Sequence, residues 1–272
     1  GFLLFVVLAS SVKAEETQFC LDEKSASINQ VLAFTTQIEN NNSIQLKSVH
    51  PSLYVDKRGL NFNKLFQQCI QTRFSQSNVK SLSNEELKKF SHVMFLTLAY
   101  TKDITIINHN LWAVEELLKR FPKNHEPALN LFYNLEMLRE FTKANEIRSQ
   151  YTEIEFPKPF NIENTISDSQ RTTLSVSKQK DTFEVKEFTF ADSQVVVIGS
   201  PMCGPTRKFI SWLEADPEVK SIMNKHSVWM IPQHDELNYD LVNEFNQNQD
   251  VAKFNYIYKQ SAWPEINDFS LP

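Results

Sequence analysis

The sequence predicts a protein of two domains in the α+β class, in which an all-α domain of helical hairpins precedes an α/β domain. Apolar residues recur at helical spacing from about residue 25 to residue 151. Two stretches typical of strands follow, an alternating one at 182–190 and a continuous β-branched one at 195–198. The 272 residues, 41% of them hydrophobic, suffice to bury two ordinary cores.

The first 14 residues form an apolar run that ends in small side chains. Val12 and Ala14 stand at the two positions that a signal peptidase reads, and the run is too short to cross a bilayer as an anchor. We therefore interpret residues 1–14 as the remnant of a signal peptide. The protein is then exported, periplasmic or secreted, with no stable membrane anchor after the signal is removed. The alternative, a buried N-terminal helix or strand, is disfavoured by the polar stretch 15–17.

Export places the three cysteines in an oxidising compartment, where two thiols of one small domain usually pair. Cys20 and Cys69 both lie in the N-terminal half, and a bridge between them would stabilise the fold by roughly 4 kcal/mol on the chain-entropy model. Cys203 is then the odd thiol. The spacing also leaves open that Cys20 and Cys69 are buried free thiols.

The helical domain is expected over residues 15–154. Ser83 and Glu86 have the spacing of a capping box, in which each side chain accepts from the other residue's backbone N–H, and an apolar stripe follows them. A helix is therefore predicted to begin there. Short polar turns at 123–127 and 139–142 join further stripes into pairs that resemble tetratricopeptide-type hairpins, although no constant repeat period is present.

Residues 155–180 are polar and lack sustained periodicity, so we interpret them as a linker to an α/β domain over 181–272. The run 195–198 is expected to be a strand covered on both faces, and 227–231 a second buried strand. A helix between them implies a parallel crossover. A further helix is predicted at 237–245.

Cys203 is the most informative residue, because it stands where the first of these strands gives way to the helix. The free N–H groups of a helix start favour thiolate over thiol. The sequence therefore makes Cys203 a candidate nucleophile.

The tetrapeptide Cys203-Gly-Pro-Thr206, in this order of elements, resembles the active-site turn of thioredoxin-like proteins, and more specifically exported bacterial members with a helical N-terminal region. The resemblance implies a substrate groove formed by Met202, Gly204 and Pro205, faced by a cis-proline for which Pro272 is the candidate. The chain stops there, so the thioredoxin-like domain is expected to be incomplete, with an open sheet edge. Alternatively, Pro272 is an unrelated residue and the domain is a smaller variant.

This chain departs from the thioredoxin pattern at two positions. Thr206 replaces the second cysteine, which resolves the mixed disulfide, and Val197 replaces the buried aspartate that serves it. The Thr206 hydroxyl could instead donate a hydrogen bond to the Cys203 sulfur. We expect monothiol exchange with protein thiols or disulfides, or with a low-molecular-weight thiol, completed by an external thiol. The alternative is a non-catalytic module that binds protein partners, which the missing second cysteine favours and the retained Cys-Gly-Pro disfavours.

Several function classes are disfavoured by the composition. A net charge of −5 gives no reason to expect a nucleic-acid partner, and four glycines leave little room for phosphate-binding loops. His226 and His234, with Asp235 and Glu236, match no metal-binding spacing. We expect no metal and no cofactor, and the sequence makes no prediction of the oligomeric state.

Overall fold

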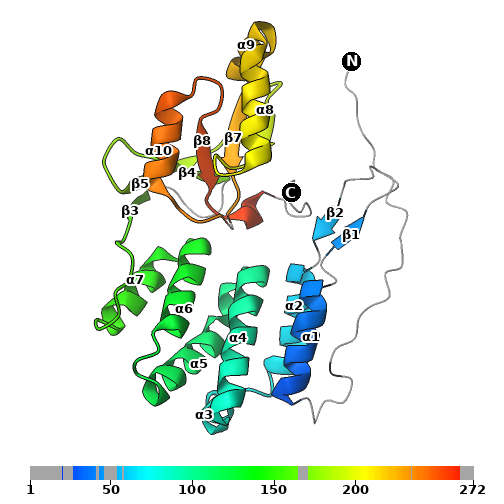
Figure 1. Ribbon diagram of the computed structural model, residues 1–272, viewed down its shortest axis with the longest axis vertical. Coiled ribbons are helices and arrows are strands. Elements are labelled where there is room, and N and C mark those ends of the chain that lie inside the picture. Colours follow the sequence, from blue (N-terminus) through cyan, green and yellow to red (C-terminus); the bar gives the residue numbers. More distant parts are fainter. Residues whose placement is uncertain are drawn as a thin grey trace.

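The computed structural model describes residues 20, 27–40, 43–45, 54–56, 58–164, 171–233 and 235–263. The predicted signal peptide at 1–14, Pro272 and His234 lie outside these residues. The protein is of mixed α/β type, with a helical N-terminal region followed by a region built on a six-stranded sheet, which lies above the helical region in Figure 1. The predicted order of a helical part and an α/β part is therefore confirmed. Among the described residues no helix combines the length and the apolar character that crossing a membrane requires.

The helical region is an array of helices that pack against one another (Figure 1). Its elements are α1 (Ile28–Asn40), a pair of antiparallel strands β1 (Ser43–Gln45) and β2 (Tyr54–Asp56), α2 (Arg58–Leu65), a π-helical turn (Phe66–Ile70), α3 (Gln76–Ser81), α4 (Asn84–Thr101), a 3₁₀ turn (Ile104–Ile106), α5 (Ile107–Arg120), α6 (Glu126–Met137) and α7 (Phe141–Gln150). The predicted capping box is present at the start of α4, where the Glu86 N–H donates to Ser83 Oγ over 3.3 Å and the Ser83 N–H to Glu86 Oε2 over 2.9 Å.

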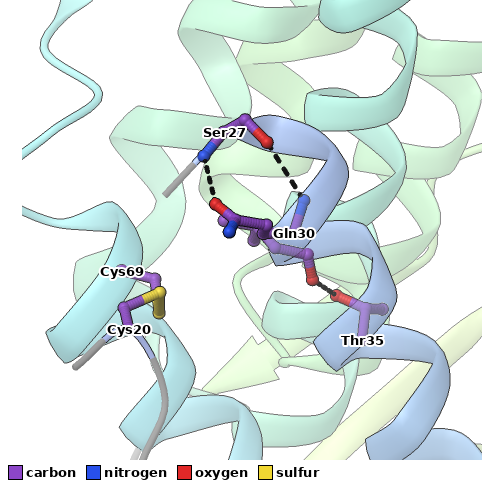
Figure 2. Close-up of a disulfide and its surroundings, with 6 residues drawn as sticks. Cys20, Ser27, Gln30, Thr35 and Cys69 are labelled. Atoms are coloured by element: carbon purple, nitrogen blue, oxygen red, sulfur yellow. Dashed lines mark hydrogen bonds between the residues drawn. A yellow bond between two sulfur atoms is a disulfide. The ribbon is translucent and has the colours of Figure 1, made fainter. Parts of the chain in front are cut away.

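A disulfide joins Cys20 to Cys69 in the helical region, which confirms the predicted pairing (Figure 2). Cys69 is fully buried in the π-helical turn, within the continuous apolar core that α1 to α7 share. Figure 2 also shows how α1 begins beside this bridge: the Ser27 N–H donates to Gln30 Oε1 over 2.8 Å, and the Gln30 N–H to Ser27 Oγ over 3.4 Å. The N-terminal end of the array is thus fixed both covalently and by helix capping.

The second region is a mixed sheet with strand order β3-β5-β4-β8-β7-β6. Its elements are β3 (Asn161–Asn164), β4 (Thr172–Val176), β5 (Thr182–Glu187), β6 (Val195–Ile198), α8 (Gly204–Ala215), α9 (Pro217–His226), β7 (Ser227–Ile231), α10 (Tyr239–Asn248) and β8 (Phe254–Ile257), followed by a 3₁₀ turn (Gln260–Ala262). β6 pairs with β7 in parallel, with Val195 opposite Ser227, which confirms the predicted crossover. β8 continues the parallel set, while β4 is antiparallel to both β8 and β5.

The two faces of the sheet are covered unequally. On one face Trp229 and Phe254 pack with Ile210 of α8 and Val242 of α10, and both helices lie in front of the sheet in Figure 1. A smaller apolar cluster around Trp263 lies apart from this core. The helices that follow β6 and β7 therefore share one layer.

Two predictions about this region are wrong. Residues 155–180, interpreted as a linker, contribute β3 and β4 to the sheet, and β4 is an interior strand whose residues Thr172 to Leu174 are buried. The run 195–198, expected to be covered on both faces, forms β6 at an edge of the described sheet, with Val195 49% exposed. A β-branched run indicates a strand, but it does not indicate whether that strand lies inside the sheet or at its edge.

The two regions meet through direct hydrogen bonds. Gln233 Nε2 donates to the Met137 carbonyl oxygen over 3.2 Å, and Lys102 Nζ to Gln260 Oε1 over 2.7 Å. Lys259 Nζ lies 3.8 Å from a Glu140 carboxylate oxygen. The end of α4 and the turn between α6 and α7 thereby contact the loops that follow β7 and β8.

Candidate functional site

Cys203 is the N-cap residue of α8, at the end of a tight turn that leaves β6. The turn is fixed by hydrogen bonds of its own backbone: the Gly199 N–H donates to the Met230 carbonyl over 2.9 Å, and the Cys203 N–H to the Ser200 carbonyl over 2.9 Å. Gly204 and Pro205 then open the helix, and the fixed φ of proline suits its first turn. The structure thus has a cysteine at the start of a helix that follows a parallel strand.

The Cys203 side chain is partly exposed, and its thiol is not part of a disulfide. It makes no capping hydrogen bond, and within the described part of the chain no hydrogen bond reaches its sulfur. Its carbonyl oxygen accepts from the Arg207 N–H over 3.1 Å. The thiol of this residue is therefore reachable from solvent beside the positive end of a helix dipole.

Thr206 does not make the hydrogen bond to Cys203 that the sequence suggested. Its side chain packs against the backbone of Gly199, where an added Cβ would lie 2.7 Å from Thr206 Oγ1 and 3.2 Å from its Cγ2. The reason is the tightness of the turn, which brings the start of α8 back onto the end of β6. Thr206 thus fills the inside of the turn, and a larger residue at position 199 would force the Thr206 side chain to shift.

A cavity of about 370 Å³ lies between the start of α8 and α10, and its wall includes Pro201 and Met202 of the turn before Cys203 but not Cys203 itself. Among the predicted groove residues only Met202 lines it, since Gly204 and Pro205 are not part of its wall and Pro272 is outside the described residues. The remaining wall comes mostly from one face of α10, at positions i, i+3, i+4 and i+7. Its lining residues are Pro201, Met202, Arg207, Leu241, Glu244, Phe245, Asn248 and Gln249.

Sequence reasoning missed the contribution of α10 to this cavity. The sequence predicts a helix at 237–245, and the apolar residues Leu241 and Phe245 of that helix are only partly buried. The signal was therefore present in the sequence as an amphipathic helix, but its nearness to Cys203 depends on the sheet order.

Two aromatic side chains on α8 extend the apolar surface away from Cys203. Phe209 and Trp212 are 40% and 59% exposed, and their rings stack with centroids 5.8 Å apart and an interplanar angle of 14°. Exposed aromatic pairs of this kind are typical of surfaces that contact another protein. They lie roughly two helical turns from the cysteine on the same helix.

The described residues contain no group of three or more His, Cys, Asp or Glu side chains arranged to hold a metal ion. His226 ends α9, where it lies in the last turn. Comparison of the chain with models of protein families, with curated proteins and with solved structures gives no match.

Proposed function

We propose that the sheet region is a thioredoxin-like domain and that Cys203 carries out thiol–disulfide exchange. The observation that supports this most strongly is the position of the residue: a partly exposed cysteine at the N-cap of α8, after a parallel strand and a short turn whose residues Pro201 and Met202 line a cavity. Backbone N–H groups at such a position stabilise a thiolate, which is the nucleophile in disulfide exchange. The disulfide Cys20–Cys69 supports the accompanying proposal that the protein is exported.

The reaction balances with one thiol in the protein and one outside it. The Cys203 thiolate attacks one sulfur of a substrate disulfide, the S–S bond breaks, and the released sulfur leaves as a thiolate that takes a proton from water. The resulting mixed disulfide is attacked by an external thiolate, such as that of a low-molecular-weight thiol, which releases Cys203 as a thiolate again. Thr206 has no part in these steps, because its side chain faces Gly199.

Labelling with iodoacetamide and reaction with oxidised glutathione test the proposal. Cys203 is the free cysteine, so the intact protein should take up one label and form one mixed disulfide at this residue. Cys203→Ser should abolish both labelling and the mixed disulfide formed with oxidised glutathione. Thr206→Ala is the matched control and should leave both unchanged. Failure of the unchanged protein to form this mixed disulfide, or undiminished formation in Cys203→Ser, would contradict the exchange function.

The stacked pair Phe209 and Trp212 favours a second candidate, a module that binds a protein partner without catalysis. In that case the exposed aromatic surface, and not the thiol, is the functional element. Trp212→Ala would then weaken partner binding, while Cys203→Ser would leave it intact. If the protein carries out exchange, Cys203→Ser should abolish formation of the mixed disulfide and Trp212→Ala should leave it intact. The two single variants therefore separate the candidates.

A further inference from the structure

A second cavity, of about 490 Å³, lies where the two regions meet, away from Cys203. Its wall combines residues of α4 and α6, the turn after α6 and the segment after β7. Charged side chains contribute to it from both regions: Glu136 and Arg139 from the helical region, and Asp235 and Glu236 from the sheet region. The cavity is thus formed only when the two regions are together.

Arg139 is the unusual member of this wall. It follows α6 with a left-handed φ of 62°, where its N–H donates to the Glu136 carbonyl over 2.9 Å and the next N–H, of Glu140, to the Leu135 carbonyl over 2.9 Å. Glycine is the residue most often found at this position of a helix end. Arg139 is nevertheless only 3% exposed, with its guanidinium 5.6 Å from the centroid of the Tyr256 ring.

The guanidinium of Arg139 is incompletely hydrogen-bonded. Nη1 donates to the Glu136 carbonyl oxygen over 3.2 Å, whereas Nε and Nη2 are buried with no partner among the described residues. Nε and Nη2 lie along one edge of the guanidinium plane and form the pair of parallel donors that a carboxylate accepts. Burial lowers the pKa of Arg139 to about 10, so the group stays positively charged at neutral pH. Two unpaired donors on a buried cation are costly, and an anionic partner would remove that cost.

The acidic residues of the cavity lie nearer its surface than Arg139 does. Glu236 is exposed, Asp235 is partly buried, and the charge of Glu236 acts on Glu136. A simple anion at Arg139 would be repelled by these carboxylates, whereas a ligand that also carries a positive group would be attracted. The arrangement of one deep cation and carboxylates toward the rim therefore matches a zwitterion. Apolar side chains complete the wall, from Phe95, Met137 and Leu237.

We propose that this cavity binds a free amino acid with an apolar side chain. Its carboxylate accepts from Nε and Nη2 of Arg139, its ammonium group lies toward Glu236, and its side chain packs against Phe95 and Met137. This site is independent of the chemistry of Cys203.

Calorimetric titration of the full chain tests the site with three probes of nearly equal size: L-phenylalanine, 3-phenylpropanoate, which lacks the ammonium group, and phenethylamine, which lacks the carboxylate. L-Phenylalanine should bind, and each analogue should bind at least about tenfold more weakly, because each loses one charged contact. No binding of L-phenylalanine, or equal binding of all three probes, would overturn the proposal.

Two variants assign the contacts within the protein. Glu236→Gln changes an exposed residue, so folding is retained. It should weaken the binding of L-phenylalanine at least about fivefold, while the binding of 3-phenylpropanoate stays unchanged or becomes tighter. Arg139→Lys keeps the charge but loses the paired donors, so it should weaken the binding of both ligands that carry a carboxylate, L-phenylalanine and 3-phenylpropanoate. Glu126→Gln, an exposed change in the first turn of the same helix as Glu136, is the control and should bind like the unchanged protein. Unaltered affinity for L-phenylalanine in Glu236→Gln would also overturn the assignment.

Discussion

The two regions of the molecule differ in where they place their large apolar side chains. Among the described residues, the helical region exposes Leu60 and Tyr133, whereas the sheet region exposes six such residues: Phe190, Val195, Met202, Phe209, Trp212 and Ile222. Four of these six lie on β6, α8 or the turn that carries Cys203. Among the described residues, the sheet region therefore leaves more of its large apolar side chains in contact with solvent than the helical region does.

The difference follows from how each core is built. The helices share one continuous apolar cluster, because each helix needs to bury only one stripe against its neighbours. A sheet has two faces and two edges, and here the helices α8 and α10 cover the same face while β6 lies at an edge. Apolar side chains near β6 consequently stay in contact with solvent.

The largest expected effect is the loss of stability when a buried apolar residue of the sheet region, rather than an exposed one, is replaced by alanine. Trp229→Ala removes a side chain that is 1% exposed and whose Nε1 donates to Ser227 Oγ over 3.0 Å, so it should destabilise the protein by about 3–5 kcal/mol. Trp212→Ala, the same substitution at a site 59% exposed, should change stability by about 0.5 kcal/mol or less. Urea unfolding followed by circular dichroism measures both. A Trp212→Ala loss comparable to that of Trp229→Ala would mean that the exposed aromatic pair is part of the core.

A comparable but region-specific effect is expected from the disulfide. The bridge closes a loop of sequence separation 49, so Cys20→Ala with Cys69→Ala should cost about 4 kcal/mol on the chain-entropy model, less if the reduced chain keeps local structure. The loss should fall on the helical region and leave the alkylation of Cys203 unchanged. Hydrogen exchange resolved along the chain would show this. Equal loss of protection in both regions would instead mean that they unfold as one unit.

The smallest expected effect is a pH-dependent change in stability that comes from Glu136, at the junction between the two regions. Burial raises the pKa of Glu136 from 4.5 to about 7, a shift opposed by Arg148 and Arg139 and assisted by Glu236. The folded state holds the Glu136 proton more tightly than the unfolded state does. The contribution of this proton to the free energy of unfolding is therefore fully present below about pH 4.5 and is lost as the pH rises to about 7. Glu136→Gln should remove this loss, which is of the order of 1–2 kcal/mol after allowance for solvent screening.

The measurement is the unfolding free energy of the two proteins at pH 5 and pH 8. The gain from Glu136→Gln should be larger at pH 8, where the unchanged protein must hold an ionised carboxylate at the junction. A gain that is equal at the two pH values, or larger at pH 5, would contradict the raised pKa.

Local features of this fold could be predicted from the sequence because their causes are local. The Ser83–Glu86 capping box and the helix start after Cys203 depend on residues within one turn of each other. The Cys20–Cys69 pairing followed from the count and placement of the cysteines. In each case the physical cause lies in a few residues or in the chemistry of one residue type.

Features set by the order of strands could not be predicted in the same way. β4 lies between β5 and β8, and β8 comes some 80 residues later in the chain, so residues 155–180 gave no sign that a sheet would include them. The wall that α10 provides next to Cys203 and the burial of Arg139 have the same origin. For Thr206 the reason is different, because the sequence does not show how closely the turn brings the start of α8 to Gly199, where the Thr206 side chain packs.

The contact between Thr206 and Gly199 makes the sizes of these two side chains interdependent. A bulkier residue at either place has to be matched by a smaller one at the other, so the two sites must be redesigned together. A cysteine introduced at position 206 to create a dithiol would inherit this crowding, and its sulfur would have to turn out of the bend before it could meet Cys203. Conversion of this chain to a self-resolving oxidoreductase therefore demands a change of rotamer as well as a change of residue.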